Sequence, residues 1–170
     1  MTNLVIDIGN TLAKLAVFND RSLSDLQLFA DLDAVTLGKY LEGKQIDYAI
    51  ISSVEKDIKD LEYVVESSGK YFRFSANVSS HIKNHYKTAQ TLGLDRYAAV
   101  IGAEAIFPSS NCLVIDAGSC ITYDFIDSKK NYYGGSISPG ITMRFQAMHT
   151  FTERLPLIEP DADFVDAYGT

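Results

Sequence analysis

The sequence LVIDIG occupies residues 4–9, and LVIDAG at residues 113–118 repeats it almost unchanged 109 positions later. Each copy is an apolar run that ends in Asp-x-Gly, and each is followed by a second, alternating run, at residues 12–18 and 121–126. This pattern predicts one β-hairpin in each copy, with the turn at the glycine. The period is too long for a solenoid repeat. It indicates two related domains, unless the similarity of two Val/Ile-rich strands arose by chance.

The composition of the 170-residue chain is that of a globular protein, since 46% of its residues are apolar. Its 22 acidic and 15 basic residues give a net charge of −7. This composition excludes a disordered or low-complexity chain. The acidic balance argues against nucleic acids and anionic membranes as partners, because both bind proteins through clustered lysine and arginine. An anionic ligand would have to be held by backbone N–H groups, a metal ion or single basic residues.

The sequence has no apolar run of the ~18 to 20 residues that a membrane span requires. Its first residues lack the basic region of a secretory signal, and Asp7 interrupts the apolar run that follows. Cys112 and Cys120 are expected to be buried free thiols, because a disulfide or a metal site would need an oxidising compartment or further ligands. We therefore expect a cytoplasmic protein.

The segments around the two copies alternate between helical and strand-like periodicity. Helices are predicted at 33–42, 58–65, 94–107 and 141–149, and strands at 25–30, 48–51, 71–74 and 132–138. Hairpins followed by alternating helices and strands are typical of the α/β class with mixed sheets. The Pro-Ser-Ser-Asn sequence at 108–111 marks the expected boundary between a first domain, residues 1–108, and a second, residues 109–170.

Polar residues surround the glycine at the end of the first apolar run: Asp7, Asn10, Thr11 and Lys14 lie around Gly9. Because glycine has no Cβ, a turn there brings backbone N–H groups close to an anion such as a phosphate. Asp7 would hold a divalent metal, directly or through water, and Mg²⁺ with one or two carboxylates plus phosphate oxygens is the usual arrangement. The alternative is an ordinary hairpin with Asn10 in a left-handed turn position.

Residues 116–119 supply the corresponding Asp-Ala-Gly-Ser element in the second copy. Two such hairpins across a cleft would hold the two ends of a polyphosphate. The sequence contains neither a G-x-x-x-x-G-K-[ST] loop nor a G-x-G-x-x-G after a strand. A P-loop NTPase and a Rossmann dinucleotide site are therefore excluded.

A second motif, at residues 91–96, opens the apolar helix predicted at 94–107. Gly93 allows the chain to turn, and Asp95 falls in the first helical turn, where the helix macrodipole favours a carboxylate that can accept a proton from a substrate hydroxyl. Arg96 beside it is able to bind a substrate carboxylate with two hydrogen bonds. The alternative is a helix cap followed by a solvent-exposed arginine.

A third motif, Tyr-Gly-Gly-Ser-Ile-Ser-Pro-Gly at residues 133–140, joins a predicted strand to a predicted helix. Paired glycines followed by proline at a helix start would leave free N–H groups that point at an incoming ligand. A tight structural corner is the alternative.

These motifs together resemble those of type III pantothenate kinases. The resemblance rests on Asp-x-Gly-Asn-Thr at 7–11, Leu-Gly-x-Asp-Arg at 92–96, Asp-x-Gly-Ser at 116–119 and Gly-Gly-x-Ile-x-Pro-Gly at 134–140. It implies two duplicated ribonuclease-H-like domains of the actin-like ATPase superfamily, which would account for the internal repeat. It also implies ATP-dependent phosphorylation of pantothenate to 4′-phosphopantothenate, the first step of coenzyme A biosynthesis.

The resemblance assigns a substrate site to the second motif. Asp95 would accept the proton of the pantothenate hydroxyl, and Arg96 would bind the pantothenate carboxylate. The other pantothenate-binding residues that it implies are Tyr86, Gly93 and Leu94.

The resemblance assigns ATP and cation binding to the two hairpins. ATP would contact Ser119 and the first hairpin, where the residues are Asp7, Ile8, Gly9, Asn10, Thr11, Leu12, Ala13 and Lys14. Asp116 would hold a monovalent cation, K⁺ or NH₄⁺, and Asp7 would hold Mg²⁺, either directly or through water. The family works as a homodimer, so a homodimer is expected here.

The sequence ends at Gly169-Thr170, where family members continue with a Gly-x-Asn/Asp-Thr motif whose threonine contacts pantothenate. The resemblance therefore implies an incomplete second domain, with apolar faces exposed at residues 112–115 and 121–126. Two alternatives to an active kinase follow: a non-catalytic nucleotide-binding or regulatory module, like the transcription-accessory proteins of this fold, and an inactive kinase fragment. Intact Asp7, Asp95, Arg96 and Asp116 favour the enzyme, because a protein that only binds has no need for the base.

Overall fold

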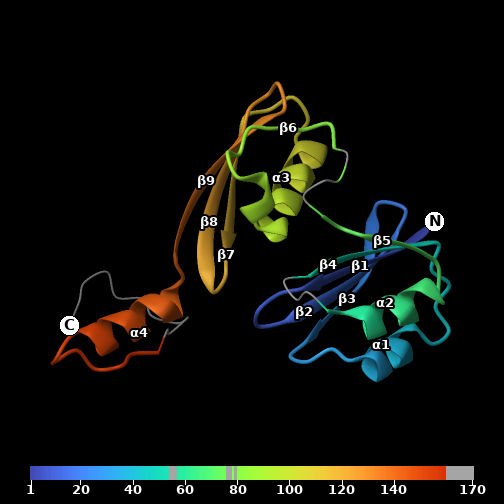
Figure 1. Cartoon of the computed structure of the whole chain (residues 1–170), viewed down its shortest axis with the longest axis horizontal. Coiled ribbons are helices and arrows are strands. Elements are labelled where there is room, and N and C mark those ends of the chain that lie inside the picture. Colours follow the sequence, from blue (N-terminus) through green and yellow to red (C-terminus); the bar gives the residue numbers. More distant parts are fainter. Residues whose placement is uncertain (54–56, 76–77, 79, 160–170) are drawn as a thin grey trace. The chain divides into compact units, whose positions relative to one another are not determined.

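The computed structural model describes residues 1–53, 57–75, 78 and 80–159. These residues form two compact units (Figure 1). The first unit contains residues 1–81 and 87–101, and the second contains 82–86 and the chain from 102 onward. The expected domain boundary at residue 108 stays a prediction, and Gly169-Thr170 lies outside the described residues.

The first unit is built on a five-stranded mixed sheet with the strand order β3-β2-β1-β4-β5. Its strands are β1 (Thr2–Ile8), β2 (Ala13–Asn19), β3 (Ser22–Phe29), β4 (Tyr48–Ser53) and β5 (Lys70–Arg73). The first three form an antiparallel meander, whereas β4 runs parallel to β1, and β5 runs parallel to β4. This arrangement confirms the predicted α/β class with a mixed sheet.

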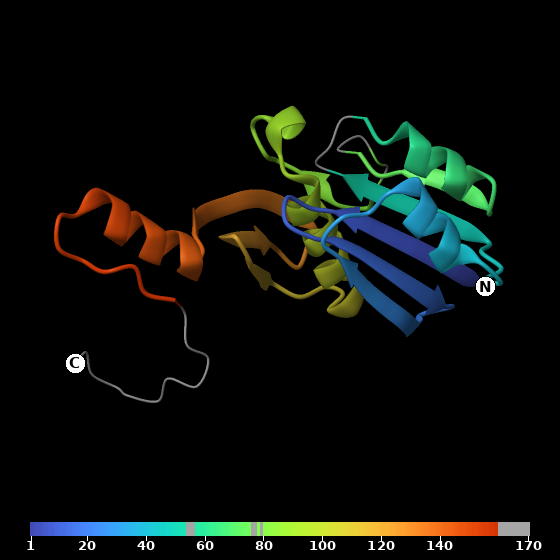
Figure 2. The ribbon, with the colours of Figure 1, turned by 90° about the horizontal axis from the view of Figure 1, so that it is seen from below.

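Two helices, α1 (Ala34–Leu41) and α2 (Lys59–Glu66), cover one face of this sheet (Figures 1 and 2). The core between them contains residues with no exposed surface, among them Leu4, Leu15 and Leu37. The buried strand residues recur at every second position, and the buried residues of α1 recur at helical spacing. The apolar pattern alone therefore predicts that they face the core between the sheet and the helices.

The second unit is built on a four-stranded mixed sheet with the strand order β6-β9-β8-β7. Its strands are β6 (Lys83–Asn84), β7 (Cys112–Ala117), β8 (Cys120–Ile126) and β9 (Asn131–Pro139). The strands β7, β8 and β9 are antiparallel neighbours, and β6 runs parallel to β9. The helix α4 (Ile141–Phe151) follows, and α3 (Leu94–Ile106) contains the last of the three points at which the chain passes from one unit to the other.

The internal repeat corresponds to equivalent hairpins in the two units. In the first, Ile8 pairs with Ala13 at the base of the turn, and the Gly9 N–H donates to the Leu12 carbonyl at 3.1 Å. In the second, Ala117 pairs with Ile121, and the Gly118 N–H donates to the Cys120 carbonyl at 2.9 Å. Both predicted hairpins are therefore confirmed, and the second turn is one residue shorter.

Apolar side chains of β7 are exposed, as predicted for residues 112–115, whereas the prediction for residues 121–126 is confirmed only in part, because Phe125 is exposed but Ile126 is buried. Leu113 is 62% exposed and Ile115 is 56% exposed on β7. Both cysteines are free thiols, but Cys112 is half-buried and Cys120 is exposed, so the prediction of buried thiols is wrong for Cys120. Cys120 is exposed because it is the first residue of β8 and directly follows the exposed turn between β7 and β8.

The longest helix of the described chain is α3, with 13 residues. No helix among the described residues is long and apolar enough to cross a bilayer.

Candidate active site

The first hairpin places Asp7 and Lys14 directly opposite each other, at the end of β1 and the start of β2. Lys14 Nζ lies 3.8 Å from Asp7 Oδ2, and the side chains are 55% and 36% exposed. A cation and a carboxylate are therefore both accessible beside the turn formed by residues 9–12. This pair is suited to contact a phosphate through the lysine and a metal ion through the aspartate.

The turn itself limits which backbone groups are able to bind an anion. The Gly9 N–H is used inside the turn, and a Cβ at this position would lie 3.3 Å from the Leu12 carbonyl oxygen. Glycine is therefore favoured here by the close approach of the chain to itself. Any backbone contact to a phosphate from this turn has to come from Asn10, Thr11 or Leu12, which are all exposed.

The second predicted site forms the start of α3 in the first unit. Asp95 lies in the first helical turn, as predicted, and is exposed. Its Oδ1 accepts the Arg96 N–H at 2.8 Å, and the Gly93 carbonyl accepts the Tyr97 N–H at 3.1 Å. A Cβ at Gly93 would collide with the Asp95 carboxylate, so glycine leaves the space that the carboxylate occupies.

Arg96 is only 5% exposed, which contradicts the alternative of a solvent-exposed arginine. Its neighbour Tyr97 is also buried, stacks on Phe74 with a centroid distance of 6.2 Å, and shares a hydrogen bond of 2.6 Å with Ser80. Arginine is rarely buried unless it is paired. The start of α3 is therefore a packed part of the first unit that presents the Asp95 carboxylate at its surface.

The second hairpin carries the remaining predicted ligands of ATP and the monovalent cation. Asp116 lies on β7 opposite Thr122 and is exposed. Ser119 lies in the turn, is exposed, and accepts the Gly140 N–H through its carbonyl at 3.0 Å. A Cβ at Gly140 would lie 2.6 Å from that carbonyl oxygen, so only glycine lets the chain after β9 approach the turn so closely.

The paired glycines of the third motif do not lie directly before a helix as predicted, whereas Gly140 directly precedes α4, and anion binding by residues 133–140 stays a prediction. Gly134 and Gly135 lie inside β9 rather than at a corner before a helix. A Cβ at Gly135 would overlap the Tyr123 carbonyl of β8, and a Cβ at Gly134 would lie 2.5 Å from the ring of Tyr86. These glycines are required because neighbouring groups of the same unit occupy the space of a side chain.

The structure also contains a buried polar pair that the sequence analysis did not identify. The Tyr132 hydroxyl donates to Asp124 Oδ1 at 2.7 Å, and the two residues are 0% and 2% exposed. The local sequence gives no signal for this burial, because alternation along the strand places Asp124 on the face opposite Tyr123 and Phe125, where a polar residue would be expected to meet solvent.

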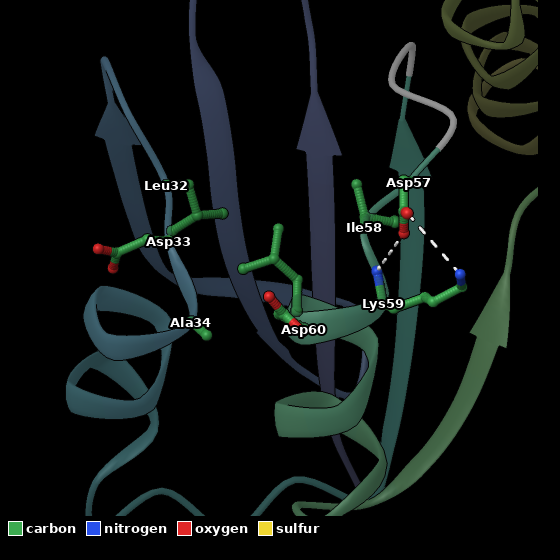
Figure 3. Close-up of a pocket in the computed structure, with 8 residues that line it drawn as sticks. Leu32, Asp33, Ala34, Asp57, Ile58, Lys59 and Asp60 are labelled. Atoms are coloured by element: carbon green, nitrogen blue, oxygen red, sulfur yellow. Dashed lines mark hydrogen bonds and ion pairs between the residues drawn. The ribbon is translucent and has the colours of Figure 1, made fainter.

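A pocket of about 340 Å³ lies between the starts of α1 and α2 (Figure 3). Its lining residues are Leu32, Asp33, Ala34, Asp57, Ile58, Lys59, Asp60 and Leu61. Asp33 Oδ1 accepts the Thr36 N–H at 2.7 Å and caps α1, and this hydrogen bond lowers the pKa of the Asp33 carboxyl. The carboxylate of Asp57 lies 3.7 Å from Lys59 Nζ. These acids have local structural roles, and none of the predicted binding residues lines the pocket.

The side chains around Asp7 and Asp116 decide whether a metal ion could bind at these positions. Among the described residues, no three His, Cys, Asp or Glu side chains come together closely enough to hold a metal ion. Asp7 and Asp116 are accessible single carboxylates. The single carboxylate of Asp7 suits Mg²⁺, which commonly binds one or two carboxylates and completes its shell with phosphate oxygens and water.

Comparison with known proteins identifies the family. The family model for type III pantothenate kinase matches residues 3–169. The chain belongs to the type III pantothenate kinase family. It is 43% identical to the type III pantothenate kinase of Christiangramia forsetii over 160 residues, which make up 93% of this chain and 66% of that protein. It is 40% identical to the Bacteroides fragilis enzyme of the same name over 168 residues, with 96% and 68% covered.

The chain spans about two thirds of the length of these curated family members. A Baf family transcriptional activator from Campylobacter jejuni superposes with a TM-score of 0.56 at 23% identity, and covers 98% of this chain and 68% of its own. At this identity the likeness concerns the fold alone.

Proposed function

We propose that this family member takes part in transferring the γ-phosphoryl group of ATP to the primary hydroxyl of pantothenate, giving 4′-phosphopantothenate for coenzyme A biosynthesis. The observation that carries the proposal is the exposed carboxylate of Asp95 in the first turn of α3, directly before the buried Arg96. Family membership supplies the substrates, and the position of Asp95 supplies a base at the surface.

Asp95 accepts the proton of the pantothenate hydroxyl as that oxygen attacks the γ-phosphorus, the bond from the γ-phosphorus to the β,γ-bridging oxygen breaks, and ADP leaves. The Arg96 N–H orients the carboxylate through its 2.8 Å hydrogen bond to Oδ1, which leaves Oδ2 to accept the proton. The Arg96 guanidinium binds the pantothenate carboxylate, and Gly93, Leu94 and Tyr86 complete the pantothenate contacts. Catalysis of phosphoryl transfer depends mainly on such positioning and on stabilisation of charge.

ATP phosphates bind at the first hairpin. Lys14 contributes its charge, and residues 10–12 contribute exposed polar and backbone groups. Ile8 and Ala13 are buried, so they take part through their backbone atoms and by holding the turn in place. Asp7 holds Mg²⁺, which when bound offsets the negative charge of the phosphate oxygens.

The second hairpin contributes Ser119 to ATP binding and Asp116 to a site for K⁺ or NH₄⁺. Both side chains are exposed at the same end of their sheet, which supports a shared role. We also propose a homodimer and a cytoplasmic location, as is expected for the family. Size-exclusion chromatography with light scattering tests the dimer directly.

The decisive experiment is an assay of phosphopantothenate formation by the whole chain with ATP, Mg²⁺ and KCl, using Asp95→Asn as the test variant. Asp60→Asn is the matched control, because Asp60 also lies in the first turn of a helix but outside the proposed site. We expect Asp95→Asn to lose about 10²-fold or more in kcat, the usual contribution of a general base, and Asp60→Asn to keep wild-type activity.

Two results would contradict the proposal. One is a folded chain that binds ATP but forms no phosphopantothenate, which would leave the two alternatives, a non-catalytic module and an inactive kinase fragment. The other is an Asp95→Asn variant with the same kcat as the Asp60→Asn control.

A further inference from the structure

Hydrogen bonds within the second unit hold the backbone on which Tyr86 lies. The short strand β6 attaches the segment before Tyr86 to β9: the Lys83 N–H donates to the Lys130 carbonyl, and the His85 N–H donates to the Tyr132 carbonyl, both at 2.8 Å. The Tyr86 N–H then donates to Asn84 Oδ1 at 2.9 Å. These three bonds fix the backbone at Tyr86.

The ring of Tyr86 stacks on the ring of Tyr132, with a centroid distance of 6.5 Å and an interplanar angle of 7°. Gly134 has a φ of +87°, and a Cβ there would lie 2.5 and 2.9 Å from two ring carbons of Tyr86. The ring therefore occupies the space that any other residue at position 134 would fill. Stacking on Tyr132 holds the ring on one side, and the lack of a side chain at Gly134 leaves the space that the ring occupies.

Tyr132 is itself fixed by a buried carboxylate. Its hydroxyl donates to Asp124 Oδ1 at 2.7 Å, and neither residue is more than 2% exposed. Burying a carboxylate is unfavourable, and an apolar pair of the same shape would often be at least as stable. A buried pair of this kind is explained better by the need to hold the Tyr132 ring in one orientation than by stability.

We propose that Asp124, Tyr132 and Gly134 form a platform that positions the Tyr86 side chain for contact with pantothenate. They are positioning residues, since they act through Tyr86 and not on the reacting atoms. The inference rests on the proposed function for the identity of the substrate. It adds to that function a physical reason for the buried Asp124–Tyr132 pair and for the glycine at position 134.

The platform is tested by ¹⁹F NMR of the whole chain labelled with 3-fluorotyrosine, with the Tyr86 resonance identified by its loss in Tyr86→Phe. Titration with pantothenate alone measures the dissociation constant at this side chain without requiring turnover. We expect Gly134→Ala to shift the resonance in the free protein and to weaken pantothenate binding about tenfold, comparable to the loss of one good hydrogen bond.

Gly43→Ala is the matched control, because Gly43 also has a positive φ, of 72°, but no atom lies within 4 Å of the position of its Cβ. It introduces the same backbone strain without displacing Tyr86, so pantothenate binding should not change. In the Tyr86→Ala background, where the Tyr86 resonance is absent and pantothenate binding is measured by isothermal titration calorimetry, Gly134→Ala should weaken binding no further, since its effect passes through the Tyr86 ring.

Tyr132→Phe and Asp124→Asn test the buried pair without changing the shape of the core. We expect Tyr132→Phe to broaden or shift the Tyr86 resonance and to weaken pantothenate binding about threefold, which is the lower range for a lost hydrogen bond. Asp124→Asn keeps a side-chain oxygen that accepts the hydrogen bond of the Tyr132 hydroxyl. This variant should therefore bind pantothenate nearly as tightly as the wild type does.

The outcomes separate this inference from the proposed function. A Gly134→Ala effect no larger than that of Gly43→Ala, or one that persists fully without the Tyr86 ring, would overturn the platform while leaving kinase activity intact. The absence of any response of Tyr86 to pantothenate would overturn it as well. Conversely, a response at Tyr86 in a chain that forms no phosphopantothenate would support the platform and contradict the proposed reaction.

Discussion

Lys14 Nζ lies 3.8 Å from Asp7 Oδ2 across the first two strands, so a cation and a carboxylate flank the turn that is expected to hold phosphate. The side chains are 55% and 36% exposed, and exposed pairs of this kind contribute only about 0 to 1 kcal/mol to stability. The pair is therefore poorly explained as a structural ion pair, and better explained as two groups available to a ligand.

Lys14→Met should consequently affect ATP binding more than folding. We expect the KM for ATP to rise about tenfold, because a hydrogen bond from a charged group to a phosphate is lost. The urea midpoint of unfolding should stay nearly constant. Lys59→Met is the control, since Lys59 lies 3.7 Å from Asp57 in a comparable exposed pair and should alter neither quantity. Equal effects of both variants on KM would contradict the assignment of Lys14.

Asp33 should stabilise the first unit in a pH-dependent manner. Its Oδ1 caps α1 by accepting the Thr36 N–H at 2.7 Å, and this bond holds the pKa of the carboxyl below its usual value. Since the lowered pKa belongs to the folded state, the stabilisation is complete above the unfolded pKa of about 3.9 and is lost as the pH falls through the folded pKa.

Urea unfolding of Asp33→Ala at pH 7 and pH 2 tests this cap. The variant should unfold at a lower urea concentration than the wild type at pH 7, and the difference should shrink at pH 2. Asp31→Ala is the control, because Asp31 is exposed just before the same helix. A difference of equal size at both pH values would show that the carboxylate is not the stabilising group.

Two glycines should respond to alanine in opposite directions. Gly38 lies inside α1, and no atom lies within 4 Å of the position of its Cβ, so Gly38→Ala should stabilise the protein by about 0.5–1 kcal/mol through the higher helix propensity of alanine. Gly135→Ala should destabilise it, because the new Cβ would overlap the Tyr123 carbonyl. Chemical denaturation measures the free energy of unfolding of both variants. A Gly135→Ala variant as stable as the wild type would contradict the close approach of β9 to the Tyr123 carbonyl of β8.

Apart from β6, the strands of both sheets could be predicted because their signals are local. The repeated apolar run with Asp-x-Gly predicts a strand and a turn from neighbouring residues alone, and both hairpins follow it. The helix α1 is predicted in the same way, since Leu37, Tyr40 and Leu41 recur at helical spacing and are all buried. The assignment to the α/β class with mixed sheets needed nothing more.

The roles of the glycines could not be predicted, because they depend on partners far away in the sequence. The pattern around Gly134 and Gly135 is the same whether the missing side chain makes room for a ligand or for another part of the chain. The structure places Tyr86 against the first and the Tyr123 carbonyl against the second. The burial of Arg96 is likewise a tertiary property, since its local sequence suits a solvent-exposed helix start equally well.

Tyrosine ionisation should destabilise the first unit at high pH. Burial, and the hydrogen bond of its hydroxyl to Asp25 Oδ2 at 3.0 Å, raise the pKa of Tyr40 well above its usual value of about 10. Burial, and a hydrogen bond to Glu62, also raise the pKa of Tyr71. Because the folded state keeps these protons where the unfolded state loses them, the free energy of unfolding is unaffected below about pH 10 and falls above it.

The Tyr40→Phe/Tyr71→Phe double variant tests this dependence by chemical denaturation between pH 8 and pH 11. The wild type should lose stability above about pH 10, and the double variant should lose markedly less, because two hydroxyls of the first unit that resist ionisation in the fold are absent. Tyr63→Phe is the control, since Tyr63 is 76% exposed and should leave the wild-type slope unchanged. If the double variant and the wild type lost stability in parallel, ionisation of the Tyr40 and Tyr71 hydroxyls would not be the cause of the loss of stability at high pH.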